Sequence, residues 1–130
     1  DQYAIEWEGS DVFASLSTNV LNGGDGNDLL YGSDGIDIFR FDNVTSQDTI
    51  YNFNSIGRDA IDISDVISYN RATDNIDDYV RFTEAGGNTI VSVDANGAAG
   101  GANFTNIATI DGVTGLDLDA AITANNLIVV

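Results

Sequence analysis

The 130-residue chain contains 21 acidic residues against four arginines and no lysine, which gives a net charge of −17 at pH 7. This charge argues against nucleic acid and anionic membranes as partners, because both would be repelled. The absence of His and Cys excludes a Ser-His-Asp triad, an imidazole base, disulfides and thiolate zinc sites.

The first 13 residues predict a strand. Apolar side chains recur through Tyr3, Ile5 and Trp7, and a second apolar pair follows at Val12 and Phe13. Such alternation is typical of a half-buried strand. We interpret residues 1–13 as a lead-in strand or a side cover for the segment that follows.

Two nine-residue repeats then follow each other without a gap, at residues 23–31 and 32–40. Both carry Gly at positions 1 and 4, Asp at position 6 and a large apolar residue at position 8. Glycine allows the positive φ angles that aim several carbonyl oxygens at one point, and Ca²⁺ takes roughly 6 to 8 oxygen ligands. A repeat of this composition and period indicates a parallel β-roll that binds calcium.

The repeat extends beyond its two clean copies. Residues 14–22 form a degenerate copy, with Asn19 at the Asp position and Leu21 at the buried apolar position, and the pattern slips before Asp48. We therefore take residues 14–53 as the roll. An ordinary hairpin turn is the competing interpretation, since Gly, Asn and Asp form turns in many proteins. A phosphate loop would need a lysine, and a dinucleotide fingerprint would need a helix after the glycines.

Residues 54–130 predict a β-rich cap with one short helix, within a single domain of mostly β structure. Turn residues separate its apolar segments, and Ala85-Gly86-Gly87 is a good hairpin loop. The expected elements are a strand at 60–63 leading into a helical turn capped by Ser64 or Asp65, a hairpin of 79–84 and 88–93, a strand at 103–110, a helix at 116–126 and an apolar strand at 127–130.

The nonapeptides and the order of segments after them resemble the RTX (repeats-in-toxin) proteins of bacteria. The tail matches in Asp48-Thr49-Ile50-Tyr51-Asn52-Phe53, in Asp59-Ala60-Ile61-Asp62-Ile63-Ser64-Asp65, in the hairpin, in the helix and in the terminal Val129-Val130. The resemblance implies the C-terminus of a large adhesin that is secreted or held at the cell surface. It also implies that residues 54–130 contain an export signal read by a type I secretion transporter complex.

The resemblance also implies a set of calcium ligands. In that family each ion lies between two turns on one edge of the roll, held by backbone carbonyls and by the Asp of each turn. Carried over to this chain, one site uses the Gly23 and Asp25 carbonyls and the Asp28 carboxylate, with Asp48 as partner. A second site uses the Ser33 and Gly35 carbonyls and Asp37, opposite Asn19.

These observations predict a non-enzymatic module that folds on calcium and directs secretion, with no membrane insertion, and that is a monomer. A calcium-dependent adhesion or carbohydrate-binding module is the alternative, with Tyr3, Trp7 and Tyr79 as a sugar platform. A glycosidase with two carboxylates has only the abundance of Asp in its favour. A ligand site needs an exposed aromatic side chain or open calcium coordination, whereas protein oxygens should close off ions within a roll.

Overall fold

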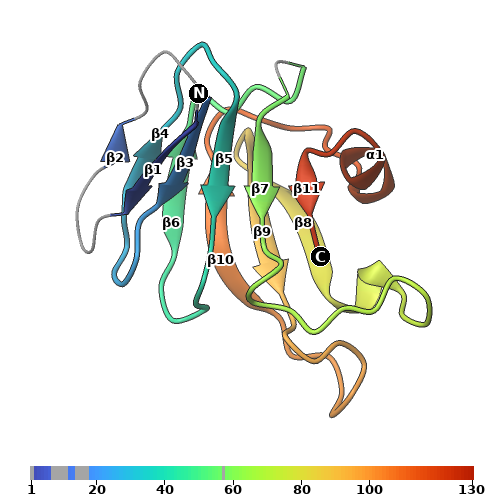
Figure 1. The fold of residues 1–130 in the computed structure, drawn as a ribbon. Coiled ribbons are helices and arrows are strands. Elements are labelled where there is room, and N and C mark those ends of the chain that lie inside the picture. Colours follow the sequence, from blue (N-terminus) through green and yellow to red (C-terminus); the bar gives the residue numbers. More distant parts are fainter. Residues whose placement is uncertain (1, 7–11, 14–17, 57) are drawn as a thin grey trace.

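The computed structural model describes residues 2–6, 12–13, 18–56 and 58–130, which form two facing β-sheets (Figure 1). The first sheet has the strand order β1-β3-β5-β7-β11 and the second has the order β2-β4-β6-β10-β9-β8. The strands of the first sheet are β1 (Gln2–Glu6), β3 (Thr18–Asn22), β5 (Asp37–Arg40), β7 (Ala60–Asp62) and β11 (Leu127–Ile128). Those of the second are β2 (Val12–Phe13), β4 (Leu29–Tyr31), β6 (Asp48–Tyr51), β8 (Val80–Ala85), β9 (Asn88–Val93) and β10 (Thr105–Ile110).

Successive strands alternate between the two sheets from β1 to β7, which is the path of a roll. Within each sheet these strands are parallel, so that β3 lies beside β5 and β4 lies beside β6. The two sheets extend past the 14–53 range expected for the roll. On one side β1 and β2 pair with β3 and β4, and on the other side β7 pairs with β5 and β10 pairs with β6.

The interior of the roll is a ladder of large apolar side chains, which begins with the position-8 residues Leu21, Leu30 and Phe39. Leu21, Phe39 and Ile61 are opposite one another in the first sheet, and Leu30, Ile50 and Ile110 are opposite one another in the second. All six side chains are at most 1% exposed. The nine-residue spacing places Leu21, Leu30 and Phe39 inside, and Ile50, Ile61 and Ile110 join them because their strands stay in register. This sheet-to-sheet packing holds the turns in position.

In the second sheet the strands are parallel as far as β10 and antiparallel from β10 to β8. The expected hairpin is present, because β8 and β9 pair in antiparallel register around the Gly86-Gly87 turn, and both glycines have positive φ. The β9 strand then pairs antiparallel with β10, and β10 is parallel to β6. The hairpin thus joins the roll's own sheet through β10.

Two helix predictions are corrected. The expected 116–126 helix is shorter, α1 (Leu118–Thr123), because Asp117 caps its start and Asn125 ends it with a positive φ of 61°. The expected helical turn after residue 63 is a non-helical turn, in which the Ser64 amide and hydroxyl both donate to Asp62. A short 3₁₀ helix, η1 (Ile76–Asp78), precedes the hairpin and was not expected.

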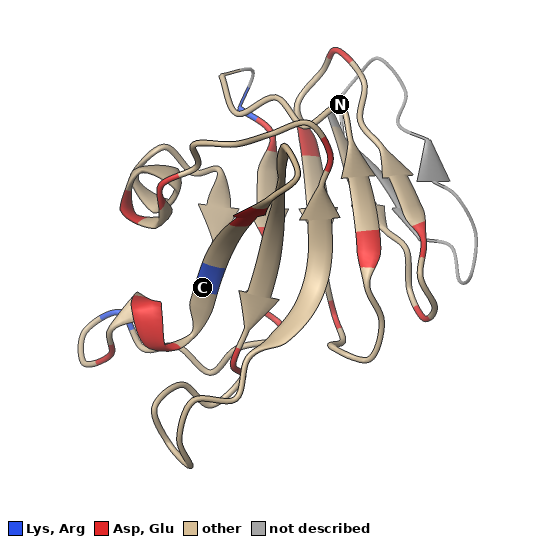
Figure 2. Ribbon diagram, turned by 180° about the vertical axis from the view of Figure 1, so that it is seen from behind, with Lys and Arg blue, Asp and Glu red and all other residues tan. Residues whose placement is uncertain are grey.

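Acidic residues occur at strand ends and in turns around the molecule, with few basic residues between them (Figure 2). Among the described residues, one ion pair joins Arg40 to Asp65 at 2.7 Å. No helix in the described part of the chain has the length and apolar character needed to cross a membrane.

Candidate calcium sites between stacked turns

The turns of the roll lie alternately on its two edges. The turn from β3 to β4 (23–28) and the turn from β5 to β6 (41–47) are on one edge, which we call the first edge. The turn from β4 to β5 (32–36) and the turn from β6 to β7 (52–59) are on the opposite, second edge. Each edge therefore stacks two described turns at the spacing of neighbouring strands, about 4.8 Å.

On the first edge, Asp28 and Asp48 are opposite each other at the ends of these turns. Asp28 precedes Leu29, which pairs with Thr49, and the Asp28 backbone N–H donates to Asp48 Oδ1 at 2.9 Å. Both aspartates are buried, at 2% and 5% exposure. The structure thus brings together the two carboxylates that the resemblance assigned to one site.

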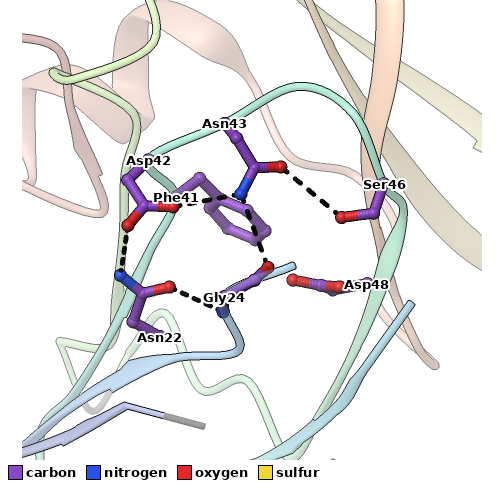
Figure 3. Close-up of a pocket in the computed structure, with 7 residues that line it drawn as sticks. All are labelled: Asn22, Gly24, Phe41, Asp42, Asn43, Ser46 and Asp48. Atoms are coloured by element: carbon purple, nitrogen blue, oxygen red, sulfur yellow. Dashed lines mark hydrogen bonds between the residues drawn. The ribbon is translucent and has the colours of Figure 1, made fainter. Parts of the chain in front are cut away.

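A small polar pocket lies beside this aspartate pair, lined by residues of both turns (Figure 3). Asn43 Nδ2 donates to the Gly24 carbonyl at 3.5 Å, and Asn22 bridges the Gly24 amide and the Asp42 carboxylate. In Figure 3 the Asp48 carboxylate is directed toward Gly24. Carbonyl, amide and carboxylate oxygens from two turns therefore surround one small volume.

On the second edge, Asp37 lies between Asn19 and Asp59. Asn19 Nδ2 donates to Asp37 Oδ1 at 3.2 Å, and the Asp37 backbone N–H donates to Asp59 Oδ1 at 2.9 Å. Asn19, Asp37 and Asp59 are all fully buried. The relation of Asp37 to Asp59 is thus the same as that of Asp28 to Asp48 on the first edge.

Asp59 is a candidate ligand that the sequence interpretation did not assign. It follows Asp48 by 11 residues, whereas the clean repeats have a spacing of nine, so counting in nines does not reach it. The signal present in the sequence was the Asp59-Ala60-Ile61 segment, which has the Asp and apolar positions of a repeat without its glycines.

The remaining expected ligands lie in the same turns. Gly23 is buried, Ser33 and Gly35 are half-buried, and Asp25 is at the exposed tip of its turn. The Ser33 backbone N–H donates to Asp37 Oδ2 at 2.7 Å, which folds that turn around its own aspartate. In the described part of the chain no three acidic side chains converge on one point, so a cation site there must include carbonyl or amide oxygens.

The buried carboxylates are electrostatically costly in the absence of a cation. Burial raises the pKa of Asp48 to about 6, and the charges of Asp28 and Asp42 raise it further, although the hydrogen bond from the Asp28 amide lowers it. Burial likewise raises the pKa of Asp59 to about 6, with the charge of Asp37 adding to the rise. The pKa of Asp37 is also raised, chiefly by burial. A bound divalent cation would remove this cost, because it favours the ionised carboxylates.

Two glycines at position 1 show how closely these aspartates approach the backbone. A Cβ atom on Gly23 would lie 2.5 Å from Asp28 Oδ2, and one on Gly32 would lie 3.1 Å from Asp37 Oδ2. A larger residue at position 23 would displace the Asp28 carboxylate, and one at position 32 would require a small shift of the Asp37 carboxylate and the Asn52 carbonyl. The donor set, hard oxygens from two turns around buried carboxylates, fits Ca²⁺.

Comparison with known proteins agrees with this geometry. The family model described as Peptidase M10 serralysin C terminal matches residues 12–127. The chain belongs to this family. It is an RTX-type family of calcium-binding β-rolls and corresponds to the non-catalytic C-terminal part of serralysin.

A solved structure has the same fold as this serralysin C-terminal family member. It is the solution structure of the AlgE6R3 subunit from the Azotobacter vinelandii mannuronan C5-epimerase, with 20% sequence identity and a TM-score of 0.55. The similarity covers 98% of this chain and 78% of that chain. No curated protein sequence matches the chain.

Of the three aromatic residues considered as a sugar platform, Tyr79 is the one whose side chain the structure describes. Tyr79 is buried, its hydroxyl donates to Asp74 and its ring packs edge-on against Tyr69. Tyr31 and Tyr51 stack on each other with an interplanar angle of 13°, so each covers one ring face of the other. Trp7 and the side chain of Tyr3 lie outside the described residues.

We expect the buried and exposed aspartates of the 32–37 turn to respond differently to the same substitution. Asp37→Asn should reduce calcium-induced stabilisation by ~1 to 3 kcal/mol, because one charged oxygen donor is lost from a buried slot. Asp34→Asn is the matched control, since Asp34 is exposed at the tip of the same turn. Chemical denaturation with and without calcium measures both effects. Equal responses would remove Asp37 from the ligand set.

Proposed function

We propose that this chain is a calcium-dependent folding and export module at the C-terminus of a large secreted RTX protein, an adhesin. The observation that carries the proposal is the pairing of buried aspartates between stacked turns, Asp28 with Asp48 and Asp37 with Asp59. Repulsion between the two carboxylates of each pair opposes folding, and a Ca²⁺ ion between the turns would convert the same carboxylates into ligands.

The energetics suit a switch between two calcium concentrations. Extracellular calcium modules have Kd values of about 10⁻⁴ to 10⁻³ M, so low cytosolic calcium would leave such sites empty. At calcium near 100 times Kd, two independent sites would add about 5 kcal/mol, a large share of the ~5 to 15 kcal/mol that stabilises a typical domain. The chain would therefore stay unfolded during export and fold outside the cell.

The export role rests on the family and on the order of the C-terminal segments. Serralysin C-terminal domains belong to secreted proteins exported by type I secretion. In this chain residues 103–130 combine β10, the short helix α1 and the apolar strand β11 without a basic residue. We assign the signal for the type I transporter complex to this segment, in a chain that acts as a monomer.

A passenger fused to this chain tests the export role separately from calcium binding. Deleting residues 116–130 is expected to abolish its secretion, because the helix and the apolar strand are lost. The double variant Asp28→Ala with Asp37→Ala is expected to be exported normally and to fold poorly in the medium. Immunoblotting of cells and medium measures export, and protease resistance of the secreted passenger measures folding. Secretion of the truncated fusion would overturn the assignment of the signal.

A further inference from the structure

One buried side chain connects the C-terminal segment to the last turn of the roll. Asn126 is 8% exposed, and its Nδ2 donates to the Asp59 carbonyl at 2.7 Å and to the Ser55 carbonyl at 3.0 Å. Its backbone N–H donates to Ala121, the last buried residue of α1, and its carbonyl accepts from Ile61 at 2.8 Å. Asn126 therefore holds α1, β7 and the turn of Ser55 and Asp59 together.

The carboxylate of Asp59 makes a separate set of hydrogen bonds. Asp59 Oδ1 accepts from the Asp37 amide and Oδ2 accepts from the Asn54 amide, both at 2.9 Å. The same residue thus presents its carboxylate to the candidate calcium slot of the second edge and its carbonyl to Asn126. A movement of this turn therefore displaces both the carboxylate and the carbonyl of Asp59.

The C-terminal segment is short, and its other anchors are the buried side chains of Ala121, Leu127 and Val129 and the backbone pairing of β11. Its strand β11 has two residues, paired with Ile61 and Asp62 of β7, and α1 has six residues. A helix of this length is unstable without tertiary contacts, so local detachment of such a segment costs much less than global unfolding. The two side-chain hydrogen bonds of Asn126 are the attachment that links this segment directly to the turn of Ser55 and Asp59.

We propose that Asn126 is a positioning residue that makes docking of residues 118–128 depend on calcium at the Asp37–Asp59 slot. Without the ion, repulsion between Asp37 and Asp59 loosens the turn, the carbonyls of Ser55 and Asp59 move, and the Asn126 amide loses both acceptors. With the ion, the turn is fixed and the segment is docked. The proposal rests on the proposed calcium function and adds that the C-terminal segment undocks before the rest of the domain unfolds as calcium is withdrawn. By linkage, docking of the segment raises calcium affinity by the same factor.

Hydrogen exchange of the whole chain in saturating calcium, and at the lowest calcium concentration that still leaves the β8–β9 hairpin protected, tests the proposal. In the unmodified chain, calcium should slow exchange of the Ile61, Ile63 and Asn126 amides, which donate within this junction, by about tenfold more than it slows the β8–β9 hairpin amides. In Asn126→Asp, which removes the donating amide, that difference should disappear and calcium affinity should fall by a similar factor.

Asn125→Asp is the matched control, because it makes the same chemical change at the exposed neighbouring residue. It should retain the calcium response of the unmodified chain. If Asn126→Asp does not fold, the comparison of junction and hairpin amides in the unmodified chain still tests whether docking is coupled to calcium. Equal calcium effects on both sets, or an Asn126→Asp variant with an unchanged response, would overturn the coupling. If calcium changes no amide of the 23–28 and 32–37 turns, it is the proposed calcium function that fails.

Discussion

Chelation with EGTA is expected to lower the melting temperature of the calcium-loaded domain by about 20 °C, or to unfold it at room temperature. Two sites filled at 100 times Kd contribute about 5 kcal/mol, and a domain of this size shifts by about 4 °C per kcal/mol. The effect should be large because four buried carboxylates, those of Asp28, Asp37, Asp48 and Asp59, then lack a counterion within a chain of net charge −17.

Circular dichroism melting curves in calcium and in EGTA measure this difference. Mg²⁺ at the same concentration is the control and should restore stability poorly, because it demands a smaller and more regular octahedral shell. Superimposable curves in calcium and in chelator would show that folding is independent of calcium, and the aspartate pairs would then be purely structural.

The calcium-free domain is expected to become less stable as the pH rises from 4 to 7. The pKa values of Asp48 and Asp59 are raised from 3.8 to about 6, so between these values the folded state binds protons more tightly than the unfolded state. The stability from these two protons is fully present below about pH 4 and is lost as the pH rises through 6. The rise corresponds to about 3 kcal/mol for each carboxyl.

The calcium-loaded domain should show the opposite dependence, since calcium binds the ionised carboxylates. Urea denaturation at pH 4, 5.5 and 7, in calcium-free buffer and in calcium, measures both trends. General charge repulsion also grows with pH, so Asp48→Asn serves as the control. It should reduce the pH dependence of calcium-free stability by the contribution of one carboxyl. Calcium-free stability that increases toward pH 7 would contradict the prediction.

The sequence was sufficient to predict the parts of the fold that repeat. The position-8 residues Leu21, Leu30 and Phe39 are buried where the nine-residue period places them, and the hairpin forms around its glycine turn. These features are local or periodic, so they leave a regular pattern in the chain. The resemblance of the Asp48-Thr49-Ile50 motif, and not the nine-residue period, indicated Asp48 as the partner of Asp28.

The contacts that do not repeat were not predictable in this way. Asp59 was missed because turns of unequal length precede it, although the strands that follow them stay in register. Asn126 reaches Asp59 across 67 residues and through a backbone carbonyl, which any residue type supplies. The shortened α1 reflects the left-handed backbone of Asn125, where Asn is tolerated but does not specify the conformation.

The hydrogen bonds between facing aspartates give the roll a direction. On the first edge Asp28 donates its amide to the later Asp48, and on the second edge Asp37 donates its amide to the later Asp59. In both turns the backbone amide of the aspartate is thus satisfied by the carboxylate of the next turn along the chain on the same edge. Loss of a preceding turn leaves these bonds intact, whereas loss of a following turn leaves a buried amide without its acceptor. In such a stack the later turns therefore stabilise the earlier ones.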